Sequence, residues 1–395
     1  MIQFIYDTDR ELFANAFRFA QKQVRQLIER DPDNYPMFTA DGAWEQEGPG
    51  LAHWCDGFLP GMMWLFYKRL GPNHGDARFW WENATRYSRP LEARKVDPNV
   101  HDLGFIFLTA YYRWYQCTHD DAVRDVMVQA GKTLAAGFKE KGQYIQSLMT
   151  EDSVFIDGIM NLGVVFYAAR ETGDKQVRDA ATRTALTIRK HLVRGDGSTA
   201  HEGVFDPETG EFLRQSTQQG YRSDSCWSRG LCWGLYGFTT AYEYSRDPRF
   251  LHTAEACADY YITHTPADGV PPWDYNAPAE SRRILDTSAA AIASAGLLRL
   301  CRHIGDPMKG HFYWSTAIHI LRTLATKYLG ETDPNWQGIL RGAVYHVHKG
   351  LGVDESVMWG EYYFVEALEE ALRVVGNILP SPPAQANYAS GNSAA

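Results

Sequence analysis

The feature that most constrains the fold of this chain is a repeated pair of helical segments. In each copy, an apolar helical stretch is followed by a turn rich in Gly, Asp or Pro and then by an amphipathic stretch. The apolar stretch has no polar face to present to water, so it must be buried, and the amphipathic stretch must cover it. Apolar stretches of this kind begin near residues 56, 102, 157, 229, 286 and 360.

Six buried helices, the five covers that follow them and one leading cover near residues 8–30 make twelve helices. Alternating inner and outer helices bury together what one hairpin cannot bury alone. We therefore predict an all-α fold, an (α/α)6 toroid (barrel), as a single catalytic domain over residues 1–379, with residues 380–395 as a disordered tail. The uneven spacing implies long loops, and the polar stretch 195–220 is expected to be one, with a short hairpin.

Composition excludes several other classes of protein. The net charge of −9 argues against nucleic-acid and membrane surfaces, and no stretch reads as a membrane span or signal peptide. The six cysteines form no Cys-x-x-Cys pair, which indicates reduced thiols. We expect a cytoplasmic protein, a monomer or small homo-oligomer, with no cofactor and no metal, since no ligand cluster stands out.

Acidic residues stand at the start of four predicted inner helices: Asp56, Asp102, Asp157 and Asp286. Aspartate is a preferred N-cap residue, and its charge complements the helix dipole. This interpretation is favoured for Asp286, which is followed by Thr287 and Ser288. For Asp56, capping and a functional role are equally supported.

Asp157 is harder to explain as a cap, because apolar residues flank it on both sides. A carboxyl in such surroundings keeps its proton at a higher pH than one in water, as a general acid requires. Asp102 follows His101, and Gly104 is expected to let a ligand approach the backbone. All inner helices begin at one rim of a toroid, so Asp102 and Asp157 can face one pocket, as in glycoside chemistry.

Further candidates fall on the same rim. Arg229 and Trp233 are four residues apart and share a helix face, Gln219 precedes them, Trp54 precedes the first inner helix, and His201 lies in the long loop. Arginine and indole rings together suit a carboxylated sugar ring. Taken singly, each tryptophan is better explained as core and Arg229 as a solvated or ion-paired residue, but their joint location weakens this explanation. Zinc-protease, phosphate-loop, dinucleotide and serine-hydrolase motifs are absent from the sequence.

Six motifs in order carry a resemblance to a known family: WCDGF, HDLGF, IDGIMNLGVVFYAARETGD, QQGYRSDSCWSRGLCWGLYGF, DTSAAAI and WGEYYFVEAL. Together they are similar to the unsaturated glucuronyl hydrolases, glycoside hydrolase family 88, over about residues 50–370. The resemblance implies an (α/α)6 barrel. It also implies a substrate: an oligosaccharide left by a polysaccharide lyase and ending in a 4,5-unsaturated uronic acid.

The resemblance further implies roles for individual residues. Asp157 matches the acid that protonates C4 of the double bond and activates the water that adds at C5, and Asp102 matches the second catalytic carboxylate. The positions that line the uronate subsite are matched by Trp54, His101, His201, Gln219, Arg229 and Trp233.

Two departures from the family pattern fall on the side of the leaving sugar. Leu148 stands where the family often has a tryptophan, and His346, His348 and Lys349 stand where some members hold a sulfate. The alternatives are an unsaturated rhamnogalacturonyl hydrolase, a sugar epimerase, or a non-catalytic glycan-binding toroid, since fold alone does not decide function.

Overall fold

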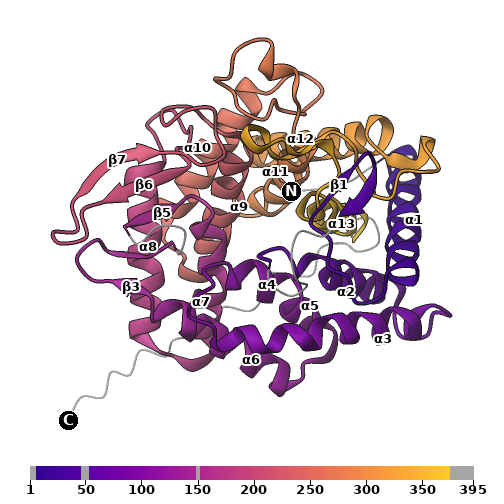
Figure 1. The fold of residues 1–395 in the computed structure, drawn as a ribbon, viewed down its shortest axis with the longest axis horizontal. Helices are drawn as coiled ribbons and strands as arrows, with labels where there is room; N and C mark the ends of the chain where they lie inside the picture. Colours follow the sequence, from indigo (N-terminus) through magenta and orange to yellow (C-terminus); the bar gives the residue numbers. More distant parts are fainter. Residues whose placement is uncertain (1–5, 46–52, 148–151, 374–395) are drawn as a thin grey trace.

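The inner ring of the barrel consists of six helical rods. The structure is a computed structural model that describes residues 6–45, 53–147 and 152–373. The rods are α2 (Phe58–Leu70), α4 (Leu103–Thr109) continued by α5 (Tyr111–Thr118), α7 (Gly158–Thr172), α9 (Ser228–Ser245), α11 (Thr287–Leu300) and α13 (Met358–Arg373). All of these helices except α5 are buried over most of their length. Neighbouring rods pack in that order, and α13 packs against α2, which closes the ring (Figure 1).

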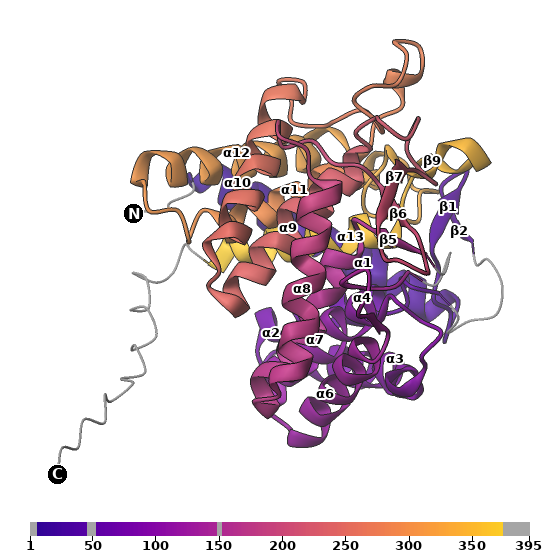
Figure 2. The same ribbon diagram turned by 90° about the vertical axis from the view of Figure 1, so that its left-hand side faces the viewer.

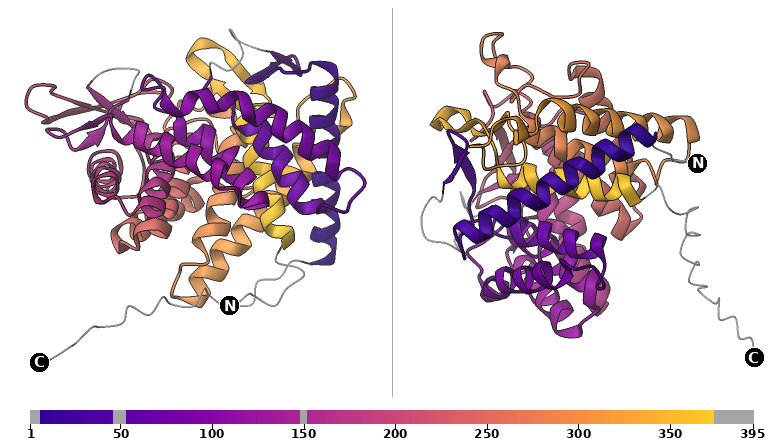
Figure 3. Two further views of the ribbon diagram at one scale, coloured as in Figure 1. Left: turned by 90° about the horizontal axis from the view of Figure 1, so that it is seen from below. Right: turned by 90° about the vertical axis from the view of Figure 1, so that its right-hand side faces the viewer.

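Six amphipathic helices cover the ring. They are α1 (Asp7–Arg30), α3 (Ala77–Ser88), α6 (Asp121–Ala135), α8 (Lys175–Leu192), α10 (Pro248–His264) and α12 (Pro307–Lys327). Helix α1 crosses the outer surface as a long rod and packs against α2, α12 and α13 (Figure 3). The predicted (α/α)6 barrel of six inner and six outer helices is therefore confirmed.

The second inner rod is split, where the sequence predicts one continuous helix. Helix α4 ends at Thr109, and α5 starts at Tyr111 after Ala110, whose φ of −87° and ψ of −65° lie at the edge of the helical region. The Thr109 hydroxyl donates a hydrogen bond back to the Phe105 carbonyl at 2.5 Å, a local bond of the kind that bends helices. Four short 3-10 helices also occur among the described residues: η1 (Arg89–Val96), η2 (Ser281–Arg283), η3 (Gly330–Thr332) and η4 (Val347–Lys349).

Short antiparallel strands lie in the segments that connect an outer helix to the next inner one. They are β1 (Phe38–Ala40) with β2 (Ala43–Glu45), β3 (Phe138–Lys139) with β4 (Tyr144–Ile145), the three-stranded sheet β5 (Ser153–Phe155), β6 (Glu202–Phe205) and β7 (Phe212–Ser216), and β8 (Ala343–His346) with β9 (Leu351–Glu355). Figure 2 shows β1, β2, β5, β6, β7 and β9 on one side of the molecule. The hairpin β6–β7 confirms the one predicted in 195–220, whereas the other strands were not predicted.

Strand β5 fixes one end of the barrel. It pairs with β6, and the next residue, Ile156, donates its backbone N–H to the carbonyl of His201 at 2.9 Å. This pairing places the start of α7 beside the long loop that precedes α9.

The six cysteines are all free thiols and all but Cys117 are buried, as predicted. No helix in the three described ranges is both long and apolar enough to cross a bilayer.

Candidate active site

A cavity of about 130 Å³ lies at the rim where the inner helices begin. Its lining contains every candidate site residue named from the sequence: Trp54, His101, Asp102, Asp157, His201, Gln219, Arg229 and Trp233. The remaining lining residues, which the sequence did not single out, are Phe105, Phe155, Gln218, Trp227 and Tyr345. Segments more than 170 residues apart therefore contribute to one small site.

Asp157 occupies the N-cap position of α7 but does not cap it. Its side chain makes no hydrogen bond to the first turn. The side chain is 20% exposed, and Oδ1 is buried with no hydrogen-bond partner among the described residues. A buried oxygen without a partner is costly to a fold, so this carboxyl is held ready for a group that the protein itself does not supply.

His201 lies beside Asp157 in a fixed tautomer. Its Nδ1 accepts the backbone N–H of Gln218 at 3.0 Å, so the ring proton is on Nε2. Nε2 is buried without a partner in the described part of the chain and lies 3.9 Å from Asp157 Oδ2, too far for a hydrogen bond. The rings of Phe155 and Trp227 clamp the imidazole. The Nε2–H of His201 and the carboxyl of Asp157 thus face the same part of the cavity.

Asp102 is held by two neighbours. Its Oδ2 lies 3.3 Å from Nε2 of His101, and its Oδ1 accepts the side-chain N–H of Asn161 at 2.9 Å. Burial raises the pKa of Asp102, while His101 and the bond from Asn161 act to lower it and the charge of Asp157 acts to raise it. The two carboxyls are therefore electrostatically coupled.

Asn161 is the functional candidate that sequence reasoning missed. Its Oδ1 accepts the backbone N–H of Phe105 at 3.0 Å while its Nδ2 binds Asp102, so it connects α4 to α7 at the site. The signal was present in the sequence: Asn161 lies one helical turn after Asp157 and is polar in an otherwise apolar helix. At 2% exposure it has no solvent-related reason to be polar.

Gly104 serves helix packing, which corrects the expectation that it admits a ligand. A Cβ atom at this residue would lie 2.4 Å from the Cα of Asn161. Glycine is therefore required for the close approach of α4 and α7 that the Asp102–Asn161 bond depends on.

Arg229 makes more hydrogen bonds within the protein than the sequence predicted. Nη1 donates to Asp286 Oδ2 at 3.2 Å and to the Val344 carbonyl at 2.5 Å. Nη2 donates to the Tyr345 carbonyl at 2.8 Å and to Gln219 Oε1 at 2.5 Å. All four Nη hydrogens are thereby used. Because Gln219 turns its oxygen to Arg229, its amide N–H groups are the donors left for a ligand.

The two predicted tryptophans differ in how much surface they present. Trp54 is half-buried and packs on Phe105 and Trp359 at centroid distances of 5.2 and 4.8 Å. Trp233 is only 1% exposed and packs on Phe105 at 5.0 Å. Trp54 can therefore offer a ring face to a sugar, whereas Trp233 supports the floor of the cavity.

The carboxylates at Asp286 and Asp56 have other roles. Asp286 Oδ1 accepts the backbone N–H of Ser288 at 3.0 Å and of Ala289 at 3.3 Å, which confirms it as a cap. Asp56 is 1% exposed, accepts the backbone N–H of His53 and lies outside the cavity lining. Burial raises the pKa of Asp56 to about 6.

The stretch 345–349 borders the site. Tyr345 lines the cavity, while His346 and His348 lie behind it, with His348 Nε2 2.8 Å from the carbonyl oxygen of Gly220. Burial, together with Lys349 and His348, lowers the pKa of His346 to about 4. Leu148 lies outside the described residues. Among the described residues, His, Cys, Asp and Glu side chains form no group of three that could hold a metal ion.

An (α/α)6 barrel with two coupled carboxyls, indole rings and amide donors around one rim cavity defines a carbohydrate-active hydrolase. Comparison with known proteins agrees. Residues 20–269 match the Glycosyl Hydrolase Family 88 profile. The unsaturated glucuronyl hydrolase of Bacillus sp. (strain GL1) is 32% identical over 348 residues, which cover 85% of this chain and 90% of that protein.

Two further relatives extend this agreement. The unsaturated chondroitin disaccharide hydrolase of Streptococcus pyogenes serotype M1 is 30% identical, covering 91% of each chain. The crystal structure of an unsaturated glucuronyl hydrolase specific for heparin superposes with a TM-score of 0.85 at 29% identity, covering 92% of this chain and 98% of that one. This chain belongs to glycoside hydrolase family 88.

Proposed function

We propose that this protein is an unsaturated glucuronyl hydrolase, which releases the 4,5-unsaturated glucuronic acid from the non-reducing end of lyase-generated oligosaccharides. The observation that carries the proposal is the Asp157 carboxyl, whose Oδ1 has no hydrogen-bond partner among the described residues and whose Oδ2 lies 3.9 Å from Nε2 of His201 in the rim cavity. The relatives' names point to the same chemistry, since they are unsaturated glucuronyl or chondroitin disaccharide hydrolases.

In the proposed reaction, the carboxyl of Asp157 gives its proton to C4 of the vinyl ether, and positive charge develops at C5. A water molecule then adds at C5 and returns a proton to the Asp157 carboxylate. The resulting hemiketal opens by breaking the bond between C5 and the ring oxygen. The former anomeric carbon is left as an open-chain hemiacetal that expels the second sugar as an alcohol. The net change is the addition of water.

The neighbours of Asp157 have distinct tasks in this scheme. Asp102 accepts hydrogen bonds from the sugar hydroxyls, and Asn161 and His101 position it. His201 Nε2–H and the Gln219 amide are the donors best placed for the uronate carboxylate. Arg229 acts through Gln219, since its own Nη hydrogens are already bonded within the fold. Trp54 stacks on the ring.

The substrate is an oligosaccharide that ends in an unsaturated uronic acid. One family member of known structure, from a Streptococcus agalactiae strain, was crystallised as a complex with dGlcA-GalNAc6S, and another is described as specific for heparin. For this chain, Tyr345 lines the cavity, and we propose that the basic stretch that follows it faces the leaving sugar. We further propose one catalytic domain over residues 1–379, a cytoplasmic location, and a monomer or small homo-oligomer.

The test uses the ultraviolet absorbance of the conjugated double bond, which hydration destroys. We expect wild-type protein to remove the absorbance of lyase-derived disaccharides of the chondroitin, heparin, hyaluronan, gellan or ulvan type, and Asp157→Asn to lose at least ~10³-fold in kcat because it lacks the proton donor. Loss with the pectin type alone would move the protein to the unsaturated rhamnogalacturonyl hydrolases. Substantial turnover by a folded Asp157→Asn variant would overturn the assignment.

A further inference from the structure

The inner ring encloses a second cavity, at the end of the barrel opposite the candidate active site. Its volume is about 320 Å³, against about 130 Å³ for the rim cavity. All six inner rods contribute to its lining, mostly from their C-terminal halves. Phe105 lines both cavities. The proposed reaction uses no polar group of this second cavity.

Basic side chains outnumber carboxylates in the lining, counting only described residues. The basic ones are Lys68, Arg113, Arg170, Arg299, Arg302 and Arg373, and the carboxylates are Glu243, Glu366, Glu369 and Glu370. Each of these carboxylates is already paired with an arginine: Glu243 with Arg299, Glu366 with Arg113, Glu369 with Arg69, and Glu370 with Arg302 and Arg373. The charge left uncompensated by side chains is therefore positive.

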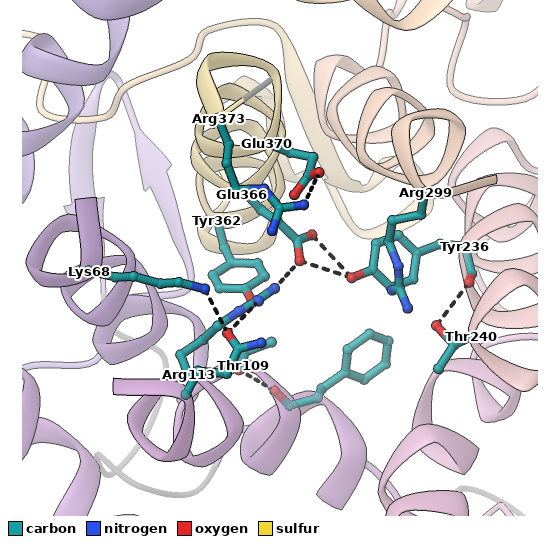
Figure 4. A network of polar contacts seen from close by, with 12 residues as sticks. Lys68, Thr109, Arg113, Tyr236, Thr240, Arg299, Tyr362, Glu366, Glu370 and Arg373 are labelled. Carbon is teal, nitrogen blue, oxygen red and sulfur yellow. Dashed lines mark hydrogen bonds and ion pairs between the residues drawn. The ribbon is translucent and has the colours of Figure 1, made fainter. Parts of the chain in front are cut away.

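Part of that surplus is Lys68 of α2, which meets Arg113 of α5, itself paired with Glu366 (Figure 4). Both cations donate to one neutral acceptor, the Oε1 of Gln116, from Nζ at 3.4 Å and from Nη1 at 3.2 Å. Lys68 makes no ion pair with a carboxylate in the described part of the chain. Two like charges held around a single amide oxygen repel each other at close range.

The electrostatic surroundings agree with this geometry. Partial desolvation, and next the charge of Arg113, lower the pKa of Lys68, although the residue is exposed to solvent. Arg113 is fixed on its other side, because its Nε donates to the Tyr362 hydroxyl at 3.0 Å and its Nη2 to Glu366. The guanidinium cannot turn away from Lys68. A negatively charged group placed between them would remove the repulsion and accept hydrogen bonds from both.

We propose that this cavity binds a small tetrahedral oxyanion, inorganic phosphate or sulfate, between Lys68 and Arg113. The anion replaces the Gln116 oxygen as the acceptor for both cations, and the Gln116 amide then turns to donate its N–H. The site lies at the opposite end of the barrel from the candidate active site and is independent of it in function.

The experiment measures thermal unfolding and calorimetric binding of the full chain with sodium phosphate and sodium sulfate separately, against sodium chloride at equal ionic strength. We expect at least one oxyanion to raise Tm beyond the chloride effect. Lys68→Met should weaken its binding about 10-fold or more, because a charge-assisted contact is lost, whereas Lys68→Arg should restore it. The matched control Lys132→Met, which removes an exposed lysine on outer helix α6, should bind as wild type does.

Three results would overturn the proposal. Equal Tm changes in phosphate, sulfate and chloride would show that the surplus charge only offsets the partial negative charges at the helix C-termini. Unchanged binding by Lys68→Met would place the anion elsewhere. Competitive inhibition of the hydrolase by the oxyanion, with the same inhibition constant in Lys68→Met, would place it in the active site.

Discussion

At the scale of single residues, the site depends on side chains in which one polar atom is hydrogen-bonded within the protein and the other faces the cavity. His201 Nδ1 is bound by backbone and the Gln219 oxygen by Arg229, whereas His201 Nε2 and the Gln219 amide nitrogen have no partner among the residues that the structure describes. Each side chain is thus oriented before a ligand arrives, which is how a preorganised site lowers the cost of binding.

The eight residues that the sequence named all line one cavity, because motif order and the shared rim of inner-helix starts both pointed to them. Their bonding could not be predicted. Arg229 donates two of its Nη hydrogens to backbone carbonyls of β8, and Trp233 is buried in part by α13. Contacts between segments more than 100 residues apart leave no local signal in the sequence.

Asn161 gives the prediction at this scale. Asn161→Ala removes the N–H that lowers the pKa of Asp102, so that pKa rises and the acidic limb of the kcat/KM profile moves to higher pH. We expect kcat/KM at neutral pH to fall roughly 10- to 100-fold, the cost of one hydrogen bond to a charged group. The control Asn83→Ala, on outer helix α3, should leave the pH profile unmoved. A fall in activity without any shift of the acidic limb would indicate a merely structural role.

At the scale of elements, the aspartates at helix starts divide into two kinds. Four of the five at the starts of outer helices cap: Asp120, Asp174, Asp247 and Asp306 each accept a backbone N–H of the first turn, whereas Asp76 of α3 does not. Asp286 does so on an inner helix. Asp102 and Asp157 occupy N-cap positions and do not cap. Sequence pattern alone cannot separate the two kinds, since residue type and position are the same. The difference lies in the backbone: the four outer-helix caps have ψ between 111° and 122°, whereas ψ is −25° at Asp157 and 23° at Asp102.

This division predicts opposite effects of substitution. Asp174→Ala removes bonds to Gln176 at 2.9 Å and Val177 at 3.2 Å, and should lower the free energy of unfolding by about 1 kcal/mol with kcat/KM unchanged. Asp157→Asn should leave the free energy of unfolding unchanged or raise it, since it removes a charge that lacks a hydrogen-bond partner. Denaturant unfolding and steady-state kinetics on both variants check this, with Asp179→Ala, exposed in the middle of α8, as the control. Equal loss of stability in both would contradict the division.

At the scale of the whole molecule, closure of the ring depends on how α13 is anchored. Glu361 on α13 is buried and accepts the backbone N–H of Ile339 at 2.6 Å and of Leu340 at 3.0 Å, which ties the segment before β8 to the barrel. The alternation of apolar and amphipathic helices predicted the ring itself. This buried acidic anchor could not be predicted, because glutamate is the residue type least expected inside a helix bundle.

Glu361 predicts a pH dependence of stability. Burial raises its pKa from the ordinary 4.5 to about 8 in the folded protein. Ionisation is therefore harder in the folded than in the unfolded chain, so this group's contribution is greatest below pH 4.5 and is lost as pH rises toward 8. Glu361→Gln cannot ionise. Relative to this variant, wild type should lose stability between pH 5 and pH 8 in chemical denaturation, whereas the exposed control Glu82→Gln should show no such trend. A constant difference across that range would contradict the account.

The central claim is that the protein adds water to a double bond, and ¹H NMR of the reaction in D₂O tests it most directly. If Asp157 delivers the proton from one side of a closed cavity, the product formed early in the reaction carries one deuterium at C4, in a single configuration, and the vinyl signal disappears as the second sugar is released. Release of the second sugar ahead of the loss of the vinyl signal, or deuterium in both configurations at C4, would mean that the glycosidic bond is broken directly and would contradict the mechanism.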